Sequence, residues 1–394
     1  MADAAVDERI RAVLAKAPVI DGHNDFPWQM RRRTRYDLSG LDITADQTAT
    51  GLHTDLPRLR AGGMGAQFWS VYVPCSLEGE AAVAATLEQI DFVHQLVDRY
   101  PDHLALARTA DEVEAAHAAG KIASLIGVEG GHSIACSMGT LRMLYALGAR
   151  YMTLTHTSNT PWADSATDDP VVGGLSEFGR EVVRECNRLG IMADLSHVAP
   201  STMHATLDVS TAPAFFSHSS ARALCDHPRN VPDDVLVRVR DTHGVVMVTF
   251  VPGFLNEACH QWMDAMIALE KDLGVAHGMH TPDFDAARDA WIADNPVPVS
   301  GTKDIADHIE HVRDVAGVDG VGIGGDFDGI EETPVDVTDV SAYPKVLAEL
   351  AARGWSDPDL AKLTWGNALR VLRDTEAAAR AARAERGPSL AVFG

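Results

Sequence analysis

The chain has 394 residues, a net charge of −23, and 46% hydrophobic against 23% charged residues. This acidic balance argues against a nucleic-acid partner, which would need a basic face to neutralise phosphates. No window approaches the roughly 18 consecutive apolar residues of a membrane-spanning helix, so no membrane partner is expected. The hydrophobic content is sufficient for a large buried core.

Residues 1–16 are acidic, alanine-rich and amphipathic. They lack the basic start and apolar centre of a signal peptide, so export is not expected. The cysteines are five in number, widely scattered and without a CxxC pair. This usage suits a cytoplasmic protein and predicts neither a disulfide framework nor a thiolate zinc site.

Eight short apolar runs recur along the chain, separated by amphipathic stretches. They cover residues 19–21, 66–73, 122–128, 151–154, 191–194, 214–216, 244–250 and 320–323. Near-continuous hydrophobic runs of this kind are typical of parallel strands that are buried on both faces. Helices are expected at 177–189, at 360–372, and around Ile305, Ile309, Val312 and Val315, which share one face. The alternation predicts an α/β fold, a single (β/α)8 TIM barrel domain over residues 1–394.

An open doubly wound sheet is the alternative, and the lack of a GxGxxG turn after any run argues against its dinucleotide-binding form. Two excursions interrupt the alternation, at residues 34–59 and 252–301, and the second includes an amphipathic piece at 263–273. Long loops after barrel strands usually cover or shape the active site. The alanine-arginine stretch 377–386 is expected to be a terminal helix.

Six of the eight runs are followed by groups able to bind a metal or transfer a proton. These groups are His23 and Asp25, Glu129, His156, His197, His218, and Asp326 with Asp328. In a barrel such strand ends converge on one face, where active sites are built. Histidine nitrogens and carboxylates together suit zinc or a similar divalent ion. A carboxylate such as Glu129 could bridge two metals.

A single histidine after a buried strand is more often a satisfied core residue than a ligand. The repetition of such groups at the same position after several runs argues for a site. Arg229 is either a surface residue capping a helix or a clamp for a substrate carboxylate. Asp326 leaves the last run in a glycine-rich turn, and Asp328 is either its partner or a turn residue. His308 and His311 are expected on the polar side of a helix.

Several motifs, in the same order along the chain, resemble the membrane (renal) dipeptidase family of metallopeptidases. They are Ile20-Asp21-Gly22-His23-Asn24-Asp25, Gly127-Val128-Glu129-Gly130-Gly131-His132, Leu154-Thr155-His156-Thr157, Asp194-Leu195-Ser196-His197, Ser217-His218-Ser219, His227-Pro228-Arg229-Asn230 and Gly324-Gly325-Asp326-Phe327-Asp328-Gly329. The resemblance extends from about Val19 to Val371 and includes Trp365-Gly366-Asn367.

The resemblance implies a barrel of the amidohydrolase superfamily with two Zn²⁺ ions, although other divalent metals could occupy the site. His23 and Asp25 would bind one zinc, His197 and His218 the other, and Glu129 would bridge them.

The same resemblance implies roles for three further residues: Asp326 would transfer the proton, and His156 and Arg229 would contact the substrate. The family cleaves dipeptides, often with a D-residue at the C-terminal position, and a homodimer is consistent with it. The hypothesis is therefore dipeptide hydrolysis by a metal-bridging hydroxide.

The chain departs from the mammalian members at one point. Those members pair a cysteine near Cys75 with a second one, whose position is Ser158 here. That disulfide is not expected, and neither are a secretion signal and a lipid anchor. The rival hypotheses are another amidohydrolase activity, such as N-acyl amino acid deacylation, and an inactive binding barrel. All five expected metal ligands are present, which argues against the inactive barrel.

Overall fold

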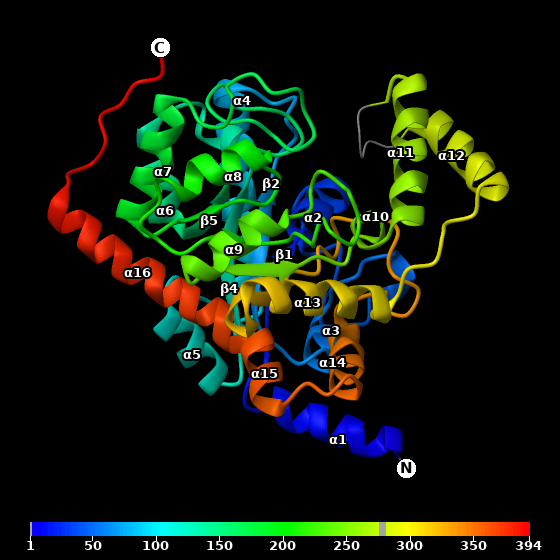
Figure 1. Ribbon diagram of the computed structural model, residues 1–394. Helices are drawn as coiled ribbons and strands as arrows, with labels where there is room; N and C mark the ends of the chain where they lie inside the picture. The colour runs from blue at the N-terminus through cyan, green and yellow to red at the C-terminus, as the bar shows by residue number, and fades with distance from the viewer. Residues whose placement is uncertain (1, 276–280) are drawn as a thin grey trace.

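The fold is a (β/α)8 TIM barrel, as the sequence predicts. In the computed structural model, which describes residues 2–275 and 281–394, eight parallel strands close into a ring surrounded by helices (Figure 1). The strands are β1 (Val19–Asn24), β2 (Met64–Tyr72), β4 (Ile122–Glu129), β5 (Ala149–Thr153), β6 (Met192–Asp194), β7 (Phe215–Phe216), β8 (Val245–Val248) and β9 (Val321–Ile323). Pairing of β1 with β9 and of β2 with β4 closes the ring.

Each of the eight predicted runs overlaps one barrel strand. A ninth strand, β3 (Leu104–Leu106), pairs outside the ring along the first half of β4 and was not expected from the sequence. The barrel interior is filled by side chains that include Phe68, Tyr151, Phe215 and Met247. The opposite faces of the strands pack against the helices. Burial on both faces explains why the strands read as continuous apolar runs.

The helices that surround the barrel are amphipathic and bury one face each. They include α4 (Gly79–Arg99), α5 (Ala110–Ala118), α6 (Met138–Leu147), α7 (Glu177–Leu189), α8 (Pro200–Leu207), α9 (Asp233–Asp241), α13 (Thr302–Ala316) and α14 (Tyr343–Ala352). The predicted helix 177–189 is confirmed with the same ends. Its N-cap is Ser176, whose hydroxyl accepts a hydrogen bond from the Gly179 amide at 3.2 Å.

The predicted helix 360–372 is real but contains a wider turn. It runs through α15 (Asp357–Ala361), the π-helical turn η5 (Lys362–Gly366) and α16 (Asn367–Glu385), which also contains most of the predicted terminal helix. The Thr364 hydroxyl donates to Ala17 O at 2.9 Å. The Asn367 amide donates to Val318 O at 2.7 Å and to Val321 O at 2.8 Å. These bonds attach the helix to the beginnings of β1 and β9.

The two predicted excursions contain helices. Residues 34–59 include η1 (Thr48–Thr50) and the start of α3 (Leu56–Ala61), and follow α2 (Phe26–Thr34). Residues 252–301 contain α10 (Pro252–Leu255), α11 (Glu257–Asp272) and α12 (Pro282–Asp294), while 276–280 lie outside the described residues. In Figure 1, α11 and α12 project from the barrel as a helical pair, which we call the hairpin. Trp262 of α11 contacts Trp291 of α12 with ring centroids 5.4 Å apart.

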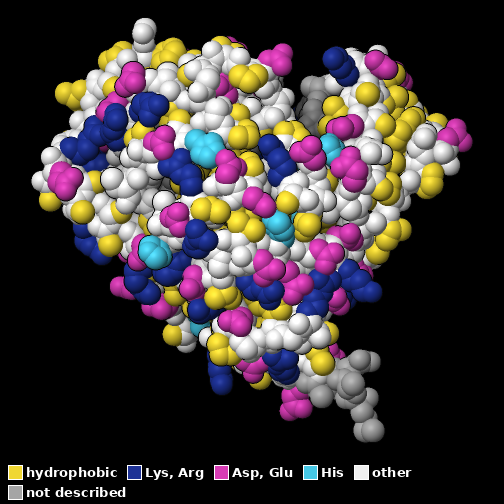
Figure 2. Space-filling model, viewed as in Figure 1, with side chains coloured by type: hydrophobic (Ala, Val, Ile, Leu, Met, Phe, Trp, Pro, Cys, Tyr) yellow, Lys and Arg dark blue, Asp and Glu magenta, His cyan; other side chains and the backbone are white. Residues whose placement is uncertain are grey.

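The outer surface carries both acidic and basic side chains. On the face shown in Figure 2 they are interspersed, without a continuous basic patch. Among residues 2–275 and 281–394, none of the helices combines the length and apolar character needed to span a bilayer. The helix α1 (Ala2–Leu14) packs against α14 and α15, with Ile10 and Val13 in the core.

Candidate metal centre

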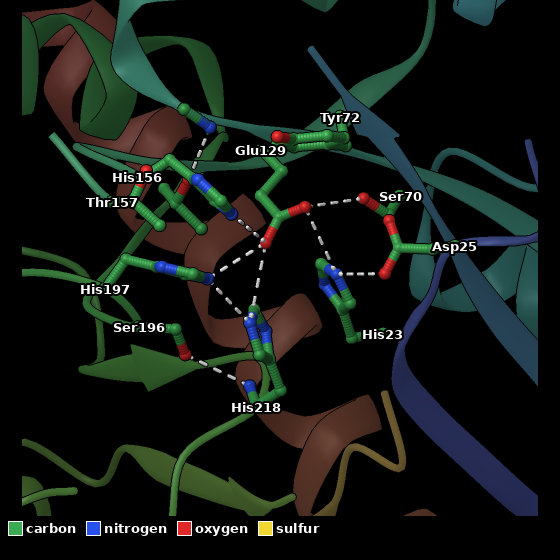
Figure 3. Close-up of polar contacts among 12 residues, drawn as sticks. His23, Asp25, Ser70, Tyr72, Glu129, His156, Thr157, Ser196, His197 and His218 are labelled. Atoms are coloured by element: carbon green, nitrogen blue, oxygen red, sulfur yellow. Dashed lines mark hydrogen bonds and ion pairs between the residues drawn. The ribbon is translucent and has the colours of Figure 1, made fainter. Parts of the chain in front are cut away.

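The barrel brings together the side chains that follow its strands. His23 lies in β1, Asp25 directly follows that strand, and Glu129 is the last residue of β4. The segments after β5, β6, β7 and β9 carry His156, His197, His218 and Asp326, respectively. Six of these seven side chains are labelled in Figure 3, grouped around Glu129. The predicted convergence of the strand ends is therefore observed.

Glu129 lies at the centre of this cluster and turns its two oxygens to different partners. Its Oε1 is 3.0 Å from His197 Nε2 and 3.6 Å from His218 Nε2. Its Oε2 is 3.4 Å from His23 Nε2 and accepts a hydrogen bond from the Ser70 hydroxyl at 3.0 Å. A carboxylate in this position is able to bridge two metal ions (Figure 3).

The surroundings of His23 fit a cation. Its Nε2 lies 3.2 Å from Asp25 Oδ2 and 3.9 Å from Asp326 Oδ1. Both His23 Nε2 and Asp25 Oδ1 are buried without a hydrogen-bond partner. Three carboxylates, those of Asp25, Glu129 and Asp326, thus surround a buried imidazole. Buried charges of one sign are unfavourable unless a counter-ion compensates them, so this donor set suits a divalent metal.

Three overlapping sets of donors lie close enough together to hold an ion. They are His23, Glu129 and His218; Glu129, His156 and His197; and His23, Asp25 and Asp326. The five expected ligands all belong to these sets. His156 and Asp326, which were expected to contact the substrate and to transfer the proton, belong to them as well.

A glycine leaves room for the two aspartates. A Cβ at Gly329 would lie 2.3 Å from Asp25 Oδ2 and 2.6 Å from Asp326 Oδ1. The turn after β9 also holds Asp326 and Asp328 at positive φ, 63° and 65°, and His197 after β6 has φ 73°. Left-handed backbone at non-glycine residues is uncommon and costs free energy, and it concentrates at functional sites.

Burial sets the protonation of two histidines in the cluster. Burial lowers the pKa of His197 well below its ordinary value, and neighbouring Arg229 and His156 lower it further. Burial also lowers the pKa of His218, with help from His23 and Arg229. Neutral imidazoles offer lone pairs to metals. Their Nε2 atoms lie 3.0 Å apart and face the same space.

The pKa of Asp326 shifts in the opposite direction. Burial raises the pKa of its carboxyl group well above the ordinary value, Asp25 and Glu129 raise it further, and His23 opposes the shift. A raised pKa makes the carboxylate a stronger base than an ordinary aspartate, which suits a group that takes up a proton and passes it on.

Arg229 lies in the wall of the same site, between β7 and α9. Its guanidinium donates to the Ser219 hydroxyl and to His218 O, both at 3.3 Å, and lies 5.5 Å from the Phe254 ring centroid. Within the described part of the chain, no carboxylate lies within 4.0 Å of it. Burial lowers its pKa to about 10, so the group still carries its charge. A buried guanidinium without a carboxylate partner suits the binding of an anionic ligand.

Comparison with known proteins agrees with this geometry. Residues 7–386 match the family described as Membrane dipeptidase (Peptidase family M19). The chain belongs to the membrane dipeptidase family.

Relatives and solved structures support this membership. An uncharacterized dipeptidase of Schizosaccharomyces pombe is 41% identical over 385 residues, which cover 94% of this chain and 84% of the relative. Dipeptidase verJ of Clonostachys rogersoniana is 41% identical over 375 residues, 92% of this chain and 86% of that protein. A metallo peptidase from Rhodobacter sphaeroides, liganded with a phosphinate mimic of the dipeptide L-Ala-D-Ala, superimposes with TM-score 0.75 at 26% identity, covering 91% of this chain and 99% of that chain.

In this metallo-dipeptidase, residues to which the sequence analysis assigned no role contact the candidate ligands and the segments that carry them. The Tyr151 hydroxyl lies 2.8 Å from His23 Nδ1, and the Ser217 hydroxyl lies 2.7 Å from His218 Nδ1. Such contacts orient a metal-binding imidazole. Asp21 Oδ1 accepts from the amide of His23 at 3.2 Å, and Asp194 Oδ1 from that of Ser196 at 3.0 Å.

The roles of Asp21 and Asp194 could have been recognised in the sequence. Each accepts from the amide two residues further along the chain, which is a common local bond of aspartate. Tyr151 had no such signal, because it reads as one more apolar residue of β5.

Three other residues have structural roles in this dipeptidase-family barrel. Asp328 is a buried turn residue whose Oδ1 accepts from the His53 amide at 2.8 Å. His308 was expected on the polar side of α13, and that prediction is wrong because its ring is fully buried. The ring accepts from the Ala221 amide at 3.0 Å and lies 2.8 Å from Leu255 O. His311 is half-buried and pairs with Asp233 at 2.7 Å.

Proposed function

We propose that this dipeptidase is zinc-dependent, holds two metal ions and tolerates a D-residue at the C-terminal position of its substrate. Dipeptide cleavage by a metallopeptidase follows from family membership. The observation that carries the two-metal proposal is Glu129, whose Oε2 faces His23 and whose Oε1 faces His197 and His218. In this assignment His23 and Asp25 hold one ion and His197 and His218 the other.

The imidazole and carboxylate donors are those that zinc prefers in catalytic sites, although manganese or iron would also accept them. When bound there, divalent ions supply a water of lowered pKa as nucleophile and polarise the scissile carbonyl. The other chemical tasks belong to the side chains that surround the cluster.

Asp326 transfers the proton in this proposal. Its carboxylate takes the proton of the attacking water and delivers it to the nitrogen of the leaving amino acid. The raised pKa of the carboxyl group matches that task. Asp326 Oδ1 lies 3.9 Å from His23 Nε2, and this closeness to the donor cluster supports the role.

His156 stabilises the developing oxyanion as a hydrogen-bond donor. Its Nε2 is 3.5 Å from Glu129 Oε1, and its ring centroid lies 4.8 Å from that of Tyr72. The ring therefore lies between the donor cluster and the Tyr72 ring. Loss of one oxyanion donor costs on the order of 10²–10³ in kcat.

Arg229 binds the C-terminal carboxylate of the dipeptide. Its buried guanidinium donates hydrogen bonds to the Ser219 hydroxyl and to His218 O. Among the described residues, no carboxylate forms an ion pair with it. A carboxylate bound there limits the substrate to one residue on the C-terminal side of the scissile bond, as a dipeptide requires. The bound L-Ala-D-Ala mimic of the Rhodobacter sphaeroides enzyme supports a D-residue at that position.

The test combines metal analysis with a substrate comparison. Elemental analysis of the purified protein should find at least two zinc ions per chain, and a chelator should abolish hydrolysis of both L-Ala-L-Ala and L-Ala-D-Ala. Added Zn²⁺ should restore both activities. Faster cleavage of an N-acetyl amino acid than of either dipeptide would instead identify a deacylase. A chain without metal and without turnover would contradict the proposal entirely.

A further inference from the structure

A second group of metal-binding side chains lies outside the barrel centre. One donor atom each from Cys225, Glu257 and His260 lies within 4.8 Å of the other two. Cys225 belongs to the segment between β7 and α9, while Glu257 and His260 belong to the first turn of α11. The dipeptidase mechanism uses none of the three.

The helix places two of these donors on one side. Glu257 and His260 are three residues apart, and side chains at that spacing are neighbours on a helix surface. The Glu-x-x-His spacing is one that helices use to present a carboxylate and an imidazole to one ion. Cys225 completes the set from a different segment, and its side chain is 2% exposed.

The His260 ring is oriented like a metal ligand. Its Nε2 lies 3.4 Å from Asp264 Oδ2, one turn further along α11. Its Nδ1 is buried without a hydrogen-bond partner and lies 3.6 Å from Glu257 Oε2. A carboxylate on one ring nitrogen and a metal on the other is the usual arrangement of a metal-binding histidine. A buried nitrogen without a partner is unfavourable unless something binds it.

The Cys225 thiol forms a weak hydrogen bond. It donates to Gly253 O at 3.6 Å. Thiolate, imidazole and carboxylate together form a donor set for a borderline divalent ion of the zinc type, with one coordination position left for water. Binding would release the thiol proton to solvent as the Cys225 sulfur becomes a ligand.

We propose that Cys225, Glu257 and His260 bind a single divalent ion of the zinc class, separate from the barrel metals, which fastens the hairpin to the segment that carries Arg229. The contacts around the cluster make this connection. The His227 ring lies 4.7 Å from that of His260. The Arg229 amide donates to His227 Nδ1 at 3.1 Å. The ion therefore holds α11 against the segment that carries Arg229.

Cobalt distinguishes this site from the barrel centre. The purified protein is stripped with a chelator and titrated with Co²⁺, because a thiolate bound to cobalt gives a charge-transfer band in the near ultraviolet. The proposed barrel ligands are nitrogen and oxygen donors only, so they give no such band. The wild-type protein should show the band and bind one more cobalt ion than Cys225→Ser, which should lack the band.

Cys259→Ser is the matched control, because Cys259 neighbours His260 in sequence but donates its thiol to Pro298 O at 3.4 Å. This variant should keep the band. Glu257→Gln changes a side chain on the surface of α11 and does not disturb the core, so it reports on the site if Cys225→Ser folds poorly. It should weaken the cobalt affinity, read from the band, by at least about tenfold.

A wild-type protein without the band overturns the inference, and so does a band that survives in Cys225→Ser or disappears in Cys259→Ser. These outcomes are separate from the dipeptidase proposal. Two metal ions with turnover but no thiolate band would contradict this site alone, whereas a chain that hydrolyses no dipeptide would contradict the proposed function.

Discussion

The Tyr151 hydroxyl lies 2.8 Å from Nδ1 of His23, inside the barrel and directly beneath the candidate metal centre. Both side chains are fully buried. The contact fixes the His23 ring so that Nε2 faces Glu129 and Asp25. It connects the packed interior of the barrel with the orientation of one proposed ligand.

Replacing Tyr151 with phenylalanine tests this connection. Tyr151→Phe removes the hydroxyl and little volume, so we expect the barrel to fold and the affinity for zinc to fall by about 10–100-fold. Chelator competition measures the affinity. Tyr36→Phe, at a half-buried tyrosine that contacts Arg31 and Phe92, serves as control and should leave the affinity unchanged. Equal affinities in all three proteins would show that Tyr151 has no orienting role.

Arg229 should determine the requirement for a free C-terminal carboxylate. We expect Arg229→Lys to lower kcat/KM for dipeptides on the order of 100-fold, equivalent to about 3 kcal/mol, because lysine keeps the charge but loses the planar pair of donors. Steady-state kinetics with a dipeptide and its C-terminal amide provide the measurement. The wild-type enzyme should discriminate strongly between the two and the variant less strongly, because the lysine charge still favours a carboxylate. An undiminished ratio in Arg229→Lys would refute the clamp.

The role of Asp326 can be separated from that of a ligand. Asp326→Asn should lower kcat by about 10²–10⁴-fold, because the amide cannot accept the proton of the attacking water. Metal content should stay at the wild-type level, and its loss would identify Asp326 as a ligand instead. Asp328→Asn, in the same turn, is the control, since its Oδ1 is still able to accept from the His53 amide. It should retain most of the activity.

His308 should make the protein less stable in acid. Burial lowers the pKa of His308 to about 4, from an ordinary value of 6.5. Because the folded-state pKa is the lower one, the unfolded chain takes up the proton first as the pH falls. The stabilisation is therefore complete above pH 6.5 and is lost between pH 6.5 and 4, on the order of 3 kcal/mol for this group.

Denaturant unfolding across this pH range measures the effect. The free energy of unfolding of the wild-type protein should fall more steeply with decreasing pH than that of His308→Gln, which cannot take up the proton. Parallel curves for the two proteins would show that His308 does not titrate in this way.

Much of the fold and the candidate site could be predicted because the evidence for them is local in the chain. The eight apolar runs identified the barrel strands, and the groups after them identified the cluster around Glu129. Strand β3 was missed because Leu104–Leu106 is too short to stand out. The prediction that His308 lies on the polar side of its helix was wrong because its polar partners, the Ala221 amide and Leu255 O, belong to distant segments.

The sequence by itself determined where the strands lie along the chain and which types of donor follow them, since both depend on neighbouring residues and a known periodicity. The alternation of strands and helices favoured a barrel over an open sheet. Only the tertiary structure decided which Glu129 oxygen faces which histidine and that Tyr151 supports His23. It also brought Cys225 to His260, although isolated cysteines gave no reason to expect a thiolate site. Such relationships depend on distances between segments far apart in the chain, and packing of the whole barrel sets those distances.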